Sequence, residues 1–336
     1  MNLRNSLTPL QILWALSLFL ICSCNRPRTH RQDIWRREIK MAVQPQCGAF
    51  TSKDSVNFNA GINLALIKTI YSFGDSWSSN GRQDGSPASP AVPQGTNPMY
   101  GRRASNGPMW TENLASNQRT LKSYAIGGAT VDHNLWRARA TKSDMVGQVD
   151  KFLSQRQPIA SDSSLATIFF GINDYSSVPE GPGTLQQAAN QLLKETDRLI
   201  GAGLRQFIIV GTYCTVFQPI EFQHQLQQRG LEWFQNLKQS RGIKFAYVDL
   251  SSLFTAIYAN PSSFGYKSTG ACLKSASTTA GGCSNPDDFL VSELFFGQSS
   301  ERLLPIEQYW IPSHPQYHTQ RLEADWVRAV LIKCQG

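Results

Sequence analysis

Short apolar runs alternate with longer segments of helical periodicity along most of the chain. The runs, rich in β-branched and aromatic residues, cover 67–73, 123–126, 165–170, 206–210 and 245–248. Apolar residues recur at helical spacing over 111–116, 145–153, 184–200, 220–237, 251–258 and 318–332. Because parallel strands need crossover helices, this alternation predicts an α/β fold. We expect a three-layer sandwich, with a five-stranded parallel sheet flanked by helices on both faces.

The chain begins with a pattern typical of a secretory signal peptide. The basic Arg4 precedes an apolar run over 12–22, and we expect residues 1–24 to be the signal of a secreted, extracellular protein. A single N-terminal membrane anchor is the alternative. Polar residues and a proline at 8–11 interrupt any extension of the run toward the roughly 20 residues that a membrane span needs.

The next segment, 25–63, is basic and then polar, and we expect it to be a leader or linker before a folded domain at 64–336. Residues 1–42 hold seven basic and two acidic side chains, so the remaining chain carries only +3 of the net charge of +8. A nucleic-acid-binding domain should carry a basic stripe on its folded part. The charge distribution therefore argues against a nucleic-acid partner.

Seven cysteines fit an oxidising compartment. Cys272 and Cys283 flank a loop rich in Gly, Ser and Thr, and a disulfide between them would stabilise it by about 3 kcal/mol. Free thiols or a metal site are the alternatives. The chain has no Cys-x-x-Cys and no histidine beside this pair, so we expect no metal and no cofactor. The pairing of Cys47, Cys214 and Cys334 is left open.

Residues suited to acyl transfer follow the predicted strands. Ser76, Gly128 and Asn173 each lie just after a strand, and His314 precedes the last helix. Each alone has an ordinary structural explanation, as a turn serine, a turn glycine, a helix cap or a structural histidine. Ligands of parallel sheets bind beyond the carboxyl ends of the strands. Together these residues would supply a nucleophile, a base and donors to an oxyanion.

The other histidines are weaker candidates for the base. His30 lies in the basic leader and His224 lies within an amphipathic helix. His133 and His318 remain alternatives.

Four ordered blocks over residues 66–333 resemble the GDSL, or SGNH, hydrolase family. The blocks are Gly74-Asp75-Ser76, Gly128, Gly171-x-Asn173-Asp174 and His314-Pro315. The stretches YSFGDSW, SYAIGGATVDH and GINDY are most similar to secreted fungal acetylesterases of that family. The resemblance implies a flavodoxin-like fold and the hydrolysis of carboxylic esters.

The resemblance also implies a role for each matched residue. Ser76 would be the nucleophile and His314 the general base. The backbone N–H groups of Ser76 and Gly128 and the side chain of Asn173 would form the oxyanion hole. Asp75 would order the turn, and its carboxylate could also face the cleft.

The chain departs from the family pattern at one position. Family members usually carry an Asp three residues before the catalytic histidine, where this chain has Ile311. Either a backbone carbonyl near Ile311 orients His314, or Glu307 folds back to do so, or activity is lost. We expect a working Ser–His dyad.

We expect the substrate to be a small-molecule or oligosaccharide ester, with acetyl groups on hemicellulose-type carbohydrate favoured. A lipid esterase or lipase, and a catalytically impaired carbohydrate-binding relative, are the alternatives. Membrane contact is expected only if the N-terminal apolar segment is uncleaved. A long irregular loop over 78–108 and the aromatic residues Trp77, Trp110, Tyr175 and Trp310 are expected at the rim of the cleft, although such rings also fill cores.

Overall fold

The computed structural model describes residues 40–48, 57–90, 100–137, 143–211, 233–234, 236–237, 239–268, 272, 288–289 and 314–335. These ranges fall within one folded unit that spans 39–336. No helix within them has the length and apolar character needed to cross a membrane. The signal or anchor expected at 1–24 lies outside the described residues and stays a prediction.

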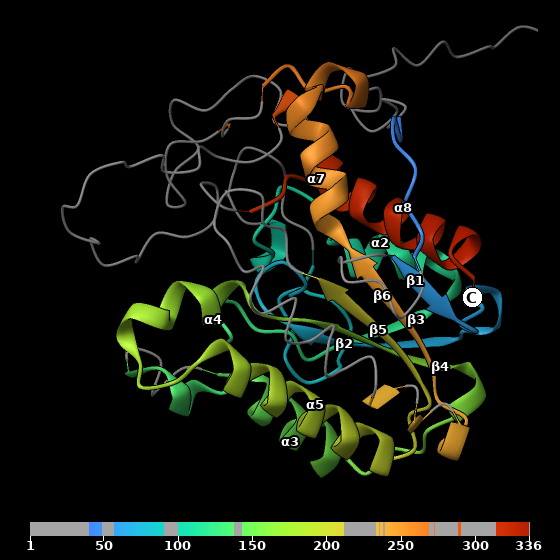
Figure 1. Cartoon of the computed structure of the whole chain (residues 1–336), viewed down its shortest axis with the longest axis vertical. Helices are drawn as coiled ribbons and strands as arrows, with labels where there is room; N and C mark the ends of the chain where they lie inside the picture. The colour runs from blue at the N-terminus through green and yellow to red at the C-terminus, as the bar shows by residue number, and fades with distance from the viewer. Residues whose placement is uncertain are drawn as a thin grey trace, which may run out of the picture. The chain divides into compact units, whose positions relative to one another are not determined.

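A six-stranded mixed sheet forms the centre of the domain (Figure 1). Its strands are β1 (Phe58–Ala60), β2 (Thr69–Gly74), β3 (Thr120–Ser123), β4 (Ser164–Phe169), β5 (Gln206–Gly211) and β6 (Lys244–Asp249). They lie in the order β1-β6-β5-β4-β2-β3, and every neighbouring pair is parallel except β1 with β6. The five parallel strands therefore have the flavodoxin-like order, whose switch point lies between β2 and β4.

Helices cover both faces of this sheet. They are α2 (Trp110–Ala115), α3 (Met145–Ser154), α4 (Ile172–Ser177), α5 (Leu185–Gly201), α7 (Leu250–Ala259) and α8 (Tyr317–Lys333). Short 3₁₀ helices lie at Leu64–Leu66, Tyr100–Arg102, Ser116–Gln118, His133–Leu135, Ser161–Ser163, Val178–Glu180 and Pro261–Phe264. Figure 1 shows α3 and α5 on one face of the sheet and α2, α7 and α8 on the other. One apolar core lies under α3 and α5, and a second lies under α2, α7 and α8. The predicted three-layer α/β fold is confirmed, but the sheet has a sixth strand, the antiparallel β1, beside the five parallel strands that were expected.

Local sequence accounts for the helix starts. Thr184 caps α5, where its hydroxyl accepts from the N–H of Gln187 at 3.2 Å and the Gln187 side chain accepts from the N–H of Thr184 at 2.8 Å. Asp249 caps α7 in the same way, by accepting from the N–H of Ser251 at 2.9 Å. Such caps satisfy backbone donors that the first helical turn leaves unpaired.

Within the described residues, the predicted strands and helices are found, with differences at β1, β3 and α4. β3 runs over Thr120–Ser123 and so ends where the predicted run begins, but the pairing with β2 continues beyond it. The N–H groups of Tyr124 and Ile126 donate to the carbonyls of Ser72 and Gly74 at 2.8 and 3.0 Å. α4 was not predicted, because its six residues are too few for a helical period to show. Most of the helix expected over 220–237 lies outside the described residues.

The segment expected as a leader or linker contributes to the folded unit. Within it, β1 pairs antiparallel with β6, so that Phe58 lies opposite Tyr247 and Ala60 opposite Phe245. A disulfide joins Cys47 to Cys334, which are 287 residues apart in sequence. The boundary placed at residue 64 is therefore too late. The sequence did not reveal this, because a strand of three residues and a single cysteine give no recognisable pattern in a polar segment.

Cys272 is disulfide-bonded. Its predicted partner, Cys283, lies outside the described residues, so this pairing stays a prediction.

Candidate active site

Gly74 ends β2 in a place that has no room for a side chain. A Cβ there would lie 2.9 Å from the Phe169 carbonyl oxygen and 3.0 Å from Ser78 Oγ. Next in the chain, Asp75 shapes a tight turn: its side-chain Oδ1 accepts from the N–H of Trp77 at 2.9 Å, and its carbonyl accepts from the N–H of Ser78 at 3.1 Å. This turn holds the half-buried Ser76 at the carboxyl end of the sheet.

His314 is placed against Ser76 from the far end of the chain. Its Nε2 lies 2.7 Å from Ser76 Oγ, across 238 residues of sequence, and the histidine is 5% exposed. An imidazole at this distance can take the hydroxyl proton when the oxygen attacks a carbonyl carbon. The structure thus brings together the predicted nucleophile and base. Ile311 and Glu307, the two candidates for orienting the ring, lie outside the described residues.

The two alternative histidines are engaged elsewhere. His133 bonds to Asp144, and His318 packs its ring 4.8 Å from that of Tyr266. His314 is therefore the histidine that the geometry supports as the base.

The predicted oxyanion donors approach Ser76 from two further strand ends. A Cβ on Gly127 would lie 3.8 Å from Ser76 Cβ, and the adjacent Gly128 has φ 77°, a conformation that favours glycine. Asn173 lies in the first turn of α4, which follows Gly171 at φ 119°. The backbone at 127–128 and the side chain of Asn173 thus come to the switch point between β2 and β4.

The Asn173 amide is already bonded in this state. Its Nδ2 donates to Asp75 Oδ2 at 3.1 Å and to the Ala129 carbonyl at 3.0 Å. These two acceptors fix the plane of the amide and link all three strand ends. Its role as an oxyanion donor remains a prediction, one that requires the tetrahedral intermediate to compete for one of these two hydrogens.

Buried carboxyl groups lie behind the nucleophile. Burial, with a smaller contribution from Asp174, raises the pKa of Asp75 from 3.8 to about 7, although hydrogen bonds from Trp77 and Asn173 act to lower it. Asp174 is itself fully buried, and its carboxylate accepts from the N–H of Val131 at 3.1 Å and from Trp136 Nε1 at 3.0 Å. Hydrogen bonds to Asp174 therefore connect the segment after β3 to α4.

Arg103, which the sequence did not single out, organises the loop expected over 78–108. It is 3% exposed, its Nε and Nη2 bond both carboxylate oxygens of Glu112 on α2, and its Nη1 donates to three loop carbonyls, those of Ser89, Tyr100 and Gly101. The sequence gives little signal for this role, because Arg103 is one of three arginines in the loop, with Arg82 and Arg102.

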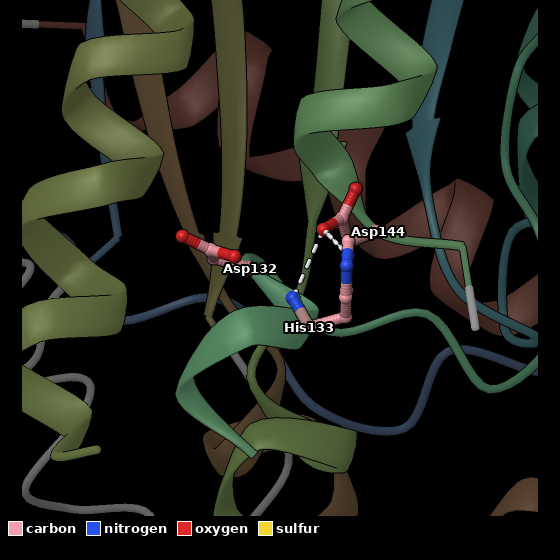
Figure 2. A group of neighbouring side chains, drawn as sticks. All are labelled: Asp132, His133 and Asp144. Carbon is pink, nitrogen blue, oxygen red and sulfur yellow. Dashed lines mark hydrogen bonds and ion pairs between the residues drawn. The ribbon is translucent and has the colours of Figure 1, made fainter. Parts of the chain in front are cut away.

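Asp132, His133 and Asp144 form one group whose ligand atoms, all within 4.8 Å of one another, could hold a metal ion. Figure 2 shows Asp144 facing the backbone and ring of His133 through one carboxylate oxygen. The other oxygen accepts from the N–H of Gly147 at 2.8 Å and caps α3, and Asp132 accepts from the N–H of Asn134 at 2.9 Å. Helix capping and one side-chain contact explain this group, and we assign no metal to it.

The aromatic residues expected at the rim are mostly core residues. Trp77 and Trp110 are 4% and 1% exposed and pack edge-on against Phe169 under the α2–α8 layer. Tyr175 is half-buried against the other core, and Trp310 lies outside the described residues. The rim assignment of Trp77 and Trp110 is therefore wrong, because both rings fill the space beneath the nucleophile turn.

Residues 70–294 match the family model of GDSL-like lipases and acylhydrolases. No curated protein matches the chain. The match includes the strand ends that carry Ser76, Gly128 and Asn173, whereas His314 lies beyond it.

Several solved structures are similar to the chain. A lipolytic G-D-S-L family protein from Veillonella parvula is 14% identical over 79% of this chain and 99% of that one, with a TM-score of 0.40. An acetylxylan esterase from Geobacillus stearothermophilus is 14% identical over 80% and 96%, with a TM-score of 0.39. A family 2 carbohydrate esterase from Corynascus thermopiles is 14% identical over 78% and 65%, with a TM-score of 0.42.

Proposed function

The chain belongs to the GDSL-like lipase/acylhydrolase family and is a serine ester hydrolase, and from this premise we propose that it is a secreted acetylesterase acting on carbohydrate esters. The observation that carries the chemistry is the 2.7 Å contact between Ser76 Oγ and His314 Nε2. The similarity of residues 71–77, 123–133 and 171–175 to acetylesterases supports acetyl groups as the substrate. The Cys47–Cys334 disulfide supports secretion, because such bonds persist in oxidising compartments.

Acylation begins when Ser76 Oγ attacks the ester carbonyl carbon while His314 Nε2 takes the hydroxyl proton. The tetrahedral oxyanion is stabilised by the N–H groups of Ser76 and Gly128 and by the Asn173 amide. The intermediate collapses by breaking the bond to the alcohol oxygen, and His314 gives its proton to that leaving alcohol. The products of this half-reaction are the free alcohol and an acyl-Ser76 ester.

Deacylation repeats these steps with water as the nucleophile. His314 takes a proton from the water, whose oxygen attacks the acyl carbon. The second tetrahedral intermediate collapses to release the carboxylic acid, and His314 returns the proton to Ser76 Oγ. The enzyme therefore ends the cycle unchanged, with one water consumed.

Hydrolysis of p-nitrophenyl esters of increasing acyl length, and of acetylated xylan fragments, tests this proposal. We expect rates to be highest for acetate and acetylated oligosaccharides, and to be lost in Ser76→Ala. Ser154→Ala, which removes an exposed hydroxyl on α3, is the matched control. A preference for long acyl chains would replace the acetylesterase with a lipid esterase. Absence of any ester hydrolysis by the wild type would favour a carbohydrate-binding relative.

A further inference from the structure

Glu323 is a buried carboxyl group that the proposed reaction does not use. It lies on α8, its exposed fraction is 0%, and neither of its carboxyl oxygens has a hydrogen-bond partner among the residues that the structure describes. An ionised carboxylate in such a place would lack both water and donors. A group placed in this way keeps its proton instead of its charge.

The layer that holds Glu323 is bonded to the nucleophile turn. Gln320, one helical turn earlier on α8, accepts through Oε1 from the N–H of Trp110 at 2.6 Å. Trp110 Nε1 donates to Ser78 Oγ at 3.1 Å, and the N–H of Ser78 donates to the carbonyl of Asp75 at 3.1 Å. Burial first, and then the charge of Asp75, raise the pKa of Glu323 well above its usual range. The two carboxyl groups therefore interact behind Ser76.

Asp75 is the better placed of the two to carry a charge. It is as deeply buried as Glu323, but its carboxylate accepts from the N–H of Trp77 at 2.9 Å and from Asn173 Nδ2 at 3.1 Å. Hydrogen bonds to a carboxylate favour its ionised form. Neither acid forms an ion pair within the described part of the chain. Two buried carboxyls that interact, with no cation paired to either, do not both ionise near neutral pH.

We propose that Asp75 and Glu323 form a buried acid pair with a single negative charge, which resides on Asp75 and makes it a positioning residue for the Asn173 amide. Glu323 holds the remaining proton. The anion on Asp75 accepts one hydrogen of the Asn173 amide and directs the plane of that group, so the proposed oxyanion donor is oriented before substrate arrives. The role of Asn173 in this inference rests on the proposed ester hydrolysis.

The other charged groups around this pair have partners of their own. On the elements packed against α8 and the nucleophile turn, these groups are Glu112 with Arg103, Asp249 with the hydroxyls of Ser251 and Ser252, Asp325 with Arg328, Asp174 with Val131 and Trp136, His318 against Tyr266, and His314 against Ser76. Asp174 also raises the pKa of Asp75, and its own carboxylate accepts hydrogen bonds from Val131 and Trp136.

The pH dependence of unfolding tests the proton on Glu323. An acid that is neutral when folded and ionised when unfolded raises the unfolding constant by up to about tenfold per pH unit above its ordinary pKa. We therefore expect the ratio of unfolding constants, wild type over Glu323→Gln, to rise by up to about 10³ between pH 5 and pH 8 in urea titrations. Glu180→Gln, which removes the same charge at an exposed site on the helix after α4, is the control and should give a flat ratio.

A flat ratio for Glu323→Gln would overturn the neutral Glu323. If that variant does not fold, Glu323→Met, which keeps the volume without a polar group, takes its place with the same expectation. This measurement requires no activity. Its failure is therefore distinguishable from a failure of the proposed function.

The acid limb of the pH–rate profile tests the charge on Asp75. If both His314 and Asp75 must lose a proton, log kcat/KM of the wild type should fall at low pH with a limiting slope of about two. In Asp75→Asn, which keeps the shape and removes the charge, the slope should be about one and kcat should fall at least tenfold with KM nearly unchanged. A wild-type slope of about one would overturn the positioning role, whatever the activity of the variant.

Discussion

Arg103 and Glu112 form a two-bond ion pair, at 2.6 and 2.7 Å, between a loop and the first turn of α2. Their side chains are only 4% and 16% exposed. The same guanidinium also donates to three carbonyls of the loop. It therefore holds together a segment that has no regular secondary structure. This loop therefore has a fixed shape without an apolar core of its own.

Arg103→Met should lower the free energy of unfolding by about 3–5 kcal/mol, because it leaves Glu112 and the loop carbonyls without their partner. Urea titration measures this loss. Arg82→Met is the matched control, since Arg82 donates from Nε to one carbonyl of the same loop, that of Pro87. Equal effects of the two substitutions would show that the ion pair contributes no more than an ordinary surface contact.

Asn173→Ala should lower kcat by roughly 10²–10³ and change KM little, as expected for one oxyanion donor. The same change removes the group that the Asp75 anion orients, so the acid limb should lose its dependence on Asp75 and its limiting slope should fall from about two to about one. Steady-state kinetics over pH 5–9 give both readouts. Asn134→Ala, at an exposed position, serves as the control, and an effect confined to KM would make Asn173 a binding residue.

His314→Ala should be nearly as damaging as Ser76→Ala, because a nucleophile and its base act as a unit. The double variant should then be little worse than either single one. Glu307→Gln distinguishes the two ways of orienting the ring and should be close to neutral if a backbone carbonyl does so. A large loss in Glu307→Gln would instead establish a triad of Ser76, His314 and Glu307.

Replacing both Cys47 and Cys334 by Ser should lower the free energy of unfolding by about 2–5 kcal/mol. The bond closes a loop of 287 residues, so its loss frees the unfolded chain and loosens β1 at the edge of the sheet. Thermal unfolding of the double variant measures the effect. A single variant at either position reveals any separate contribution of a free thiol, and unchanged stability of the double variant would mean that β1 is held by packing alone.

The parallel part of the fold was predictable because its signals are local. Each run of strand-forming residues is short and stops at a glycine or polar residue, as in 165–170 before Gly171. β1 gave no such signal, because its three residues depend on β6, far away in sequence, for their burial. The disulfide partner of Cys47 was likewise unpredictable, since spacing says nothing about a contact across 287 residues.

The site was predictable to the extent that its residues follow strands. Ser76 and His314 were identified from their places and prove to be in contact. Trp77 and Trp110 were wrongly predicted at the rim, because the sequence does not show whether a ring that follows a strand, or one that begins a helix, points outward or into the core. The acids Asp75, Asp174 and Glu323 carry no mark of burial in the sequence, and only packing shows that they share one interior.

The bond between Cys47 and Cys334 also makes the domain a covalent ring. A single cut by a protease in any loop between these two residues opens the ring but releases no fragment, so the nicked protein would migrate as one species on a non-reducing gel and as two on a reducing gel. Strands on either side of a cut, such as β2 and β6, would still be joined covalently through the disulfide. Damage to an exposed loop would then leave the nucleophile and the base on the same molecule.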